Sequence, residues 1–237
     1  MMNRIFKSAL VSLGVLLSVV VGLAFPAWAE TPQTDVQFIQ ALGGQPTDKV
    51  LAALAVYYDL HVLEIGVQLT REQNTGAFFA ARRAEGDGDN AEAQRQMDMF
   101  ESTKAALADA RKANQGLRQK LADMTGIAFA DDLAVAPDVP DALPAAHADA
   151  PADLLTARAA AWAQVEAARQ SWREMRLQLL EDQERYDKTR EVKLGDSMRA
   201  MTRAEVAMAR AACDFRLIEA KTAAATGQPL ADVLAGL

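Results

Sequence analysis

The stretch RRAEGDGDN, residues 82–90, lies between two long segments that have the apolar spacing of helices. Apolar residues recur every three or four positions before it and again after it, which is typical of amphipathic helices. Glycine and aspartate are the residue types that end one helix and begin the next. The stretch therefore predicts the turn of a helical hairpin, whose first arm begins near Pro46 and whose return arm stops at Thr125-Gly126.

The chain contains this pattern twice. A second helical segment begins near Pro151 and reaches Gly195, and its return segment ends at Thr226-Gly227. Arms of about 40 residues would be about 60 Å long at a rise of 1.5 Å per residue. The sequence thus predicts an all-α fold of two long antiparallel helical hairpins in tandem, coiled-coil-like or α-barrel-like, with no β-barrel.

The segments outside the hairpins complete the organisation of the chain. In order they are a signal peptide at 1–29, an N-terminal extension at 30–45, the first hairpin at 46–126, a linker rich in proline and aspartate at 127–150, the second hairpin at 151–227 and a C-terminal tail at 228–237. The linker holds three prolines and no basic residue. We therefore expect an extended backbone between the hairpins.

The first thirty residues resemble a secretory signal. Arg4 and Lys7 precede an uncharged apolar run at 9–25, and Ala27 and Ala29 are small residues at the positions that a signal peptidase reads. We expect cleavage after Ala29 and a mature chain in the periplasm, where it could associate with the outer membrane or envelope. An uncleaved anchor is the alternative, because the apolar run lies at the short limit of a membrane span. No further transmembrane span is expected after signal removal.

Each arm carries an apolar seam at spacings of three and four residues. The predicted seams are Met97, Phe100, Leu107, Ala110, Leu117, Leu121 and Met124 in the second arm, Val165, Trp172, Leu179 and Tyr186 in the third, and Met201, Ala204, Met208, Ala211, Phe215, Ile218, Thr222 and Ala225 in the fourth. Lys104 and Asn114 interrupt the second seam, and polar residues in such positions fix register at some cost in stability. The first arm is apolar on two faces, which predicts neighbours on two sides.

Composition argues against several classes of function. The chain has 25 basic and 32 acidic residues, for a net charge of −7, so it lacks the basic surface that nucleic acid requires. The single cysteine, Cys213, has no partner for an internal disulfide. Nucleic acid is therefore not an expected partner.

Catalytic and metal-binding patterns are also weak. His61 lies among apolar residues and is interpreted as a packing residue, and His147 has no cysteine or second histidine near it. The segment DGDN at 87–90, with Glu92, resembles the start of a calcium loop, but Ala91 and Glu92 stand where such a loop needs a ligand and a glycine. We expect no catalytic residues, no cofactor and no metal, and hence a protein that is not an enzyme.

Several motifs carry a resemblance to a known family. The segments VYYDL (56–60), RRAEGDGD (82–89) and LADMTG (121–126), in that order, resemble the first helical hairpin of TolC-like outer-membrane efflux factors. The segments DLL (153–155), KLGD (193–196), RAEV (203–206) and ATGQPL (225–230) resemble the second hairpin. The resemblance covers about residues 46–230.

This resemblance implies a tandem repeat from the α-helical periplasmic tunnel of those trimers, whose hairpin tips contact an adaptor protein. The residues that it places at the tips are Arg82, Gly86, Asp87 and Asp89 in the first hairpin and Leu194, Gly195 and Asp196 in the second. Family members also insert strands that build a membrane barrel, whereas this chain continues from Leu154 to Val192 without a break, and only residues 127–135 alternate. The second return arm is eight residues shorter than the first, so we expect its tip to pack differently.

Three functions follow from these observations. The chain could be a barrel-less efflux or type I secretion relative that forms a conduit or collar, as a homo-oligomer such as a trimer or together with a full-length relative. It could instead be a periplasmic coiled-coil spacer without a transport role. It could also be an adaptor-like or sensor protein that presents its tips to a partner. An enzyme is the least favoured reading.

Overall fold

The computed structural model describes residues 32, 34–129, 139–147, 149–189 and 194–237, and the predicted signal peptide lies outside them. Within these residues the chain is all-helical and has no strand, which confirms the predicted all-α class. The helices are α2 (Asp35–Ala41), α3 (Thr47–Gly86), α4 (Asn90–Thr125), α5 (Ala152–Thr189), α6 (Leu194–Ala225) and α7 (Leu230–Ala235).

The ends of the long helices follow local chemistry. Pro46 precedes α3, and the Asp89 side chain caps α4 by accepting a hydrogen bond of 3.0 Å from the backbone N–H of Glu92. After α4 and α6, Gly126 and Gly227 adopt left-handed φ angles of 73° and 70°. A left-handed glycine is a common helix terminator, so the two Thr-Gly ends were readable from sequence.

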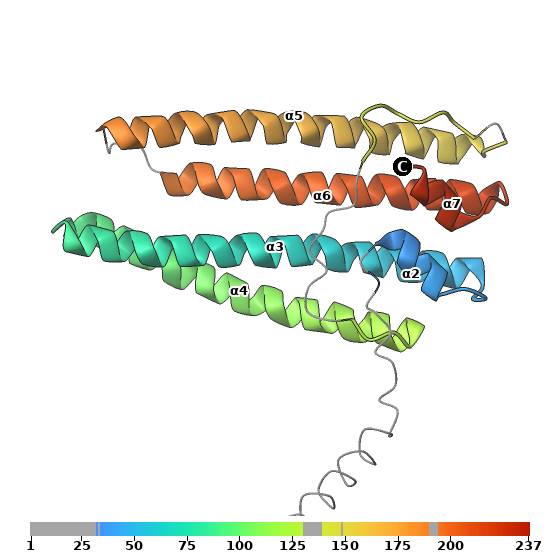
Figure 1. Cartoon of the computed structure of the whole chain (residues 1–237), viewed down its shortest axis with the longest axis horizontal. Helices are drawn as coiled ribbons and strands as arrows, with labels where there is room; N and C mark the ends of the chain where they lie inside the picture. Colours follow the sequence, from blue (N-terminus) through green and yellow to red (C-terminus); the bar gives the residue numbers. More distant parts are fainter. Residues whose placement is uncertain (1–31, 33, 130–138, 148, 190–193) are drawn as a thin grey trace, which may run out of the picture. The chain divides into compact units, whose positions relative to one another are not determined.

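The four long helices lie in one layer. The helix α3 packs along α4 and α6, and α5 packs along α6 (Figure 1). Among the described residues, no close backbone contact joins α4 to α5, α3 to α5 or α4 to α6. The order across the layer is therefore α4, α3, α6, α5. By close backbone contacts, the inner helices α3 and α6 each have two long neighbours, whereas the outer helices α4 and α5 each have one. Near the start of α6, the side chain of Met99 on α4 also reaches Gly195 and Arg199.

The core is concentrated on the inner helices. Its largest fully buried side chains include Tyr57 and Leu54 of α3, Phe215 of α6 and Phe38 of α2. The rings of Phe38 and Tyr57 stack at 4.4 Å, and Trp162 of α5 meets Phe215 edge-on at 5.2 Å. The prediction that the first arm has neighbours on two sides is confirmed, because α3 buries one face against α4 and another against α6.

This burial also explains the composition of α3. By length and mean hydropathy α3 could cross a membrane, yet 56% of its most apolar window is buried inside the structure. A core helix of a soluble protein has the same properties. The window includes Asp59, which pairs with Arg210 of α6. We interpret α3 as a core helix.

A buried ion pair joins the two ends of the described chain. Arg216 of α6 donates from Nε to Oδ2 of Asp35 at 2.5 Å and from Nη2 to Oδ1 at 3.0 Å. The Tyr58 hydroxyl donates to the same carboxylate at 2.6 Å, and Arg216 also donates to the carbonyl of Leu234 at 2.8 Å. One guanidinium thereby holds α2, α3, α6 and α7 together. Neither α2 nor α7 was predicted from the sequence.

Each outer helix is attached to its inner neighbour by an arginine, partly buried in α4 and buried in α5. Arg118 of α4 pairs with Glu64 of α3, and Arg158 of α5 pairs with Glu219 of α6 at 2.5 Å. Both arginines also hold the linker, because Arg118 donates to the carbonyl of Phe129 at 3.2 Å and Arg158 donates to the carbonyl of Pro144 at 2.8 Å. The described parts of the linker thus lie against the helices.

Two positions correct the predicted seams, and a third has a specific polar partner. Met124 is 41% exposed and Ala225 is also exposed, so neither belongs to a buried seam. Both stand at the last turn of a helix, where the partner helix no longer covers them. Asn114, predicted to interrupt the second seam, is buried and donates a hydrogen bond to Glu64. Its polar group therefore has a specific partner on α3.

Candidate functional site

The first tip, residues 86–89, is a tight connection between α3 and α4. The N–H of Gly88 donates to the carbonyl of Glu85 at 3.2 Å, and the N–H of Asp89 donates to the carbonyl of Ala84 at 2.9 Å. These two bonds form the Schellman arrangement that ends a helix. Asp89 then caps α4, so the reversal takes only residues 87–89.

The glycine that permits this turn is Gly88. It has a φ of 78°, which side chains other than glycine rarely adopt. Gly86, by contrast, is the last residue of α3, and a Cβ there would meet nothing within 4 Å. The chain stays helical up to Gly86, so the left-handed position of the turn belongs to Gly88 alone among residues 86–89.

The side chains at the first tip are charged and aromatic. Arg82 and Glu85 form an exposed ion pair at 2.9 Å, and the Arg82 guanidinium lies 5.5 Å from the ring centroid of Phe78. The neighbouring Phe79 is 63% exposed. Asp87 and Asp89 are exposed as well, so this end of α3 and α4 presents an aromatic surface bordered by both signs of charge.

The second tip, residues 194–196, has a different environment. Leu194 begins α6 and is half-buried, while Asp196 is exposed and accepts a hydrogen bond from Arg199. A Cβ on Gly195 would stand 3.1 Å from the sulfur of Met99 on α4. Gly195 thus allows the Met99 side chain to lie against α6. The preceding residues 190–193 are outside the described chain.

The two tips do not form a common surface. Gln73 of α3 donates to the carbonyl of Met198 in α6 at 3.2 Å. This hydrogen bond fixes the register of α3 against α6. About 20 Å of helix separates Gln73 from Gly86, and about 6 Å separates Met198 from Leu194. The first tip therefore extends roughly 14 Å beyond the start of α6. Figure 1 shows the end of α3 extending beyond the start of α6.

A polar contact near the second tip was not predicted from the sequence. Asp182 of α5 is buried and accepts hydrogen bonds from Ser197 of α6 and, at 3.1 Å, from Gln178. The hydrogen bond from Ser197 lowers the pKa of the Asp182 carboxyl, and the bond from Gln178 lowers it further. This contact fixes the register of α5 against α6. Asp182 lies one turn after Leu179 and was hidden in a charged segment of the sequence.

The histidines and the cysteine are structural residues. His61 is buried with its ring 4.5 Å from that of Tyr57, and His147 lies with Nε2 3.6 Å from Glu219. Burial raises the pKa of the Cys213 thiol to about 12, which leaves little of the reactive thiolate at neutral pH. In the described part of the chain, no group of three or more His, Cys, Asp or Glu side chains could hold a metal ion.

The outer edges of the layer expose apolar side chains. On α5, Leu177 and Leu180 are 62% and 55% exposed, although large aliphatic side chains are usually buried. On α4, the exposed residues include the alanines Ala105, Ala106 and Ala108. One edge therefore carries large apolar side chains and the other a run of small ones.

Comparison of the chain with protein-family models, curated proteins and solved structures found no match. The resemblance to efflux factors therefore rests on the sequence motifs alone.

Proposed function

We propose that this chain is a periplasmic helical-hairpin protein related to TolC-like outer-membrane efflux and secretion factors, and that it is a conduit or collar component associated with transport. In this proposal α3 with α4 and α5 with α6 are two tandem antiparallel hairpins. The observation that supports it is the order of the helices, α4, α3, α6, α5, in a layer whose outer members each make close backbone contacts with one long helix.

A self-contained four-helix bundle would bring its outer helices into contact with each other and close the core. Here α4 and α5 lie at opposite edges. A layer with two open edges can be continued by a second copy, so that α5 of one subunit packs against α4 of the next. Such a head-to-tail contact closes into a ring when the rotation between subunits allows it. A trimer is the assembly that the family resemblance implies.

The side chains at the two edges suit this contact. The exposed Leu177 and Leu180 on α5 are large enough to act as knobs, and the alanines at 105, 106 and 108 on α4 leave space between helices. Burying leucine side chains contributes roughly 1.5–3 kcal/mol each relative to leaving them exposed. Association of copies would therefore remove the largest exposed aliphatic groups of α5 from water.

The test is the mass of the mature chain, beginning at Glu30, measured by size-exclusion chromatography with light scattering. We expect a trimer for the wild type and a monomer for the double variant Leu177→Glu, Leu180→Glu. The control is Gln164→Glu, Ser171→Glu, which adds the same charge at exposed positions on the other flank of α5 and should remain trimeric. A monomeric wild type at high concentration would overturn the conduit proposal and favour the spacer reading.

A further inference from the structure

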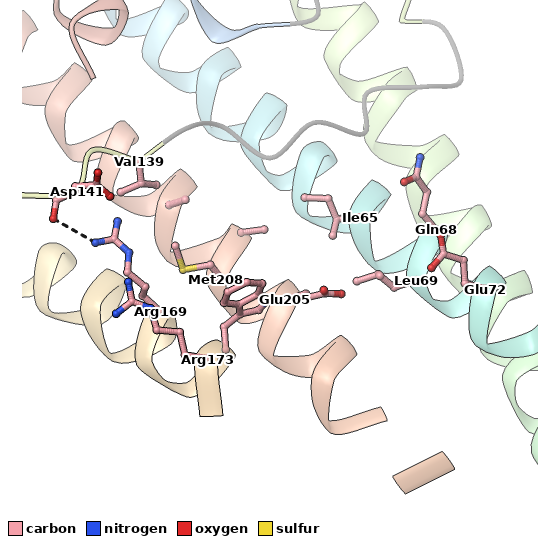
Figure 2. Close-up of a pocket in the computed structure, with 13 residues that line it drawn as sticks. Ile65, Gln68, Leu69, Glu72, Val139, Asp141, Arg169, Arg173, Glu205 and Met208 are labelled. Atoms are coloured by element: carbon pink, nitrogen blue, oxygen red, sulfur yellow. Dashed lines mark hydrogen bonds between the residues drawn. The ribbon is translucent and has the colours of Figure 1, made fainter. Parts of the chain in front are cut away.

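A groove of about 570 Å³ lies between α3, α5, α6 and the linker at residues 139–141 (Figure 2). Its size falls in the range of small-molecule sites, roughly 300–1,000 Å³. Much of its surface is apolar and comes from all three helices, namely Ile65 and Leu69 of α3, Trp172 of α5, and Met208, Ala209 and Ala212 of α6. No residue of this groove belongs to either tip.

The charged groups of the groove form two sets. Arg169 and Arg173 stand on α5 beside Asp141, whereas Glu205 and Glu72 lie toward Leu69 and α3 (Figure 2). Arg169 is already engaged, because it donates to the carbonyl of Pro140 at 3.0 Å and to that of Asp141 at 3.4 Å. Its guanidinium also lies 5.8 Å from the ring centroid of Trp162. Arg169 is thus used to hold the linker.

The second set of charged groups consists of the carboxylates Glu205 and Glu72. Burial raises the pKa of Glu205, a hydrogen bond from Trp172 lowers it, and the negative charge of Glu72 raises it again. Two carboxylates on neighbouring helices therefore repel each other next to an apolar surface and an indole. A positive charge placed between them would relieve that repulsion. The Trp172 ring already has the Arg176 guanidinium 5.2 Å from its centroid, so Trp172 offers the ligand apolar surface and not a free cation–π face.

We propose that this groove binds an organic cation with an apolar, ring-sized body, with the body against Trp172, Ile65 and Leu69 and the positive charge between Glu72 and Glu205. An inorganic cation would leave the apolar surface unused, because hard cations take several oxygen ligands. An organic anion would have to compete with the linker carbonyls for Arg169. This site is independent of the proposed conduit role, since it does not involve the edges or the tips.

The proposal has a dependence on pH. A cation binds the ionised form of Glu205, so binding should weaken as pH falls through the raised pKa of that carboxyl. The other charged residues that line the groove are Glu72 from α3, Arg169 and Arg173 from α5, and Asp141 from the linker, and of these Glu72 acts on the pKa of Glu205.

The experiment uses calorimetric titration of the mature full-length chain with tetraphenylphosphonium, a permanent organic cation, and with tetraphenylborate, an anion of the same shape. We expect the phosphonium to bind at least tenfold more tightly than the borate at pH 7.5. Glu72→Gln and Glu205→Gln should each weaken phosphonium binding at least fivefold, whereas Glu101→Gln, on the exposed surface of α4, should leave it unchanged. Circular dichroism spectra confirm that the variants are folded.

Repeating the titration at pH 5.5 gives a second readout. Binding by the wild type should be weaker than at pH 7.5, and this difference should shrink in Glu205→Gln. Three outcomes would overturn the proposal: equal affinity for the two ions, unchanged phosphonium affinity in both glutamine variants, or no binding of the phosphonium at all. The first two outcomes would mean that the groove is only an apolar surface.

Discussion

Arg216 connects more of the molecule than any seam residue that the sequence indicated. Its guanidinium, buried among α2, α3, α6 and α7, makes two hydrogen bonds to Asp35 and a third to the carbonyl of Leu234. A pair of this kind is costly to break, because the surviving partner remains as an uncompensated buried charge. Hydrogen bonding to Asp35 also raises the pKa of Arg216, although burial acts in the other direction.

Replacing Arg216 with leucine should therefore lower the free energy of unfolding by about 3–5 kcal/mol, because Asp35 loses its ion pair. Urea denaturation followed by circular dichroism measures this change. The double variant Asp35→Leu, Arg216→Leu removes both charges and should be more stable than either single variant. Single variants as stable as the wild type would show that the pair contributes nothing.

Two aromatic residues of the predicted seams should differ in their contribution to stability. Phe215 is fully buried against Trp162, so Phe215→Ala should cost about 3–5 kcal/mol. Trp172 is only partly buried and lines the groove, so Trp172→Ala should cost clearly less. Thermal melts of the two variants compare the effects directly. Equal losses would mean that Trp172 is packed as fully as Phe215.

Among the helices, the turn at residues 87–89 shows how one residue sets the geometry of a connection. Gly88→Val forces a β-branched residue into a left-handed conformation and should cost about 1–2 kcal/mol. Gly86→Val, in the last turn of α3 with open space around it, should change stability by less than about 0.5 kcal/mol. Urea denaturation of both variants distinguishes the two glycines. The same loss in both would contradict the assignment of the turn to Gly88.

The long helices could be predicted because their signals are local. Apolar spacing, Pro46 before the first arm, the turn at 82–90 and Thr125-Gly126 at the end of the return arm predicted the limits of α3 and α4 within a few residues. The short helices α2 and α7 have only seven and six residues, and they are held by contacts with distant parts of the chain. A segment of that length has too few turns to show a reliable period, so its structure depends on its partners.

The groove could not be predicted for a related reason. Its walls come from α3, α5, α6 and the linker, which lie far apart in the sequence. Glu72 and Glu205 stand in segments that resemble ordinary solvated helix faces, and Trp172 was interpreted as a seam residue. Their common position arises only when α3 and α6 lie side by side. The order of helices across the layer likewise required the structure.

For the whole molecule, the first tip provides a test of partner binding that is independent of assembly. If the proposed transport role holds, a periplasmic adaptor protein of an inner-membrane transporter should bind at the exposed aromatic and charged end of α3. The variant Phe79→Ser, Arg82→Ser removes those groups from exposed positions and should leave the fold intact. In pull-downs from envelope extracts, the adaptor should be recovered with the wild type and not with this variant.

The matched control for that experiment is Arg95→Ser, Glu101→Ser, two exposed positions on α4 outside the tip. It should recover the adaptor as the wild type does. Identical sets of partners for the wild type and the tip variant would remove the tip from the binding role and favour a spacer.

The ion pair between Asp35 and Arg216 joins residues 181 positions apart, and this has a consequence for the order of folding. Contacts within α3 and α4 are local and can form early, whereas a contact of such long range forms late. In the chain α2 precedes its partners α6 and α7 by more than 150 residues, so this pair cannot close before α6 has been synthesised. Along the proposed export route, the nascent chain would thus stay without this closure until α6 and α7 have been made, which keeps it accessible to the secretion machinery.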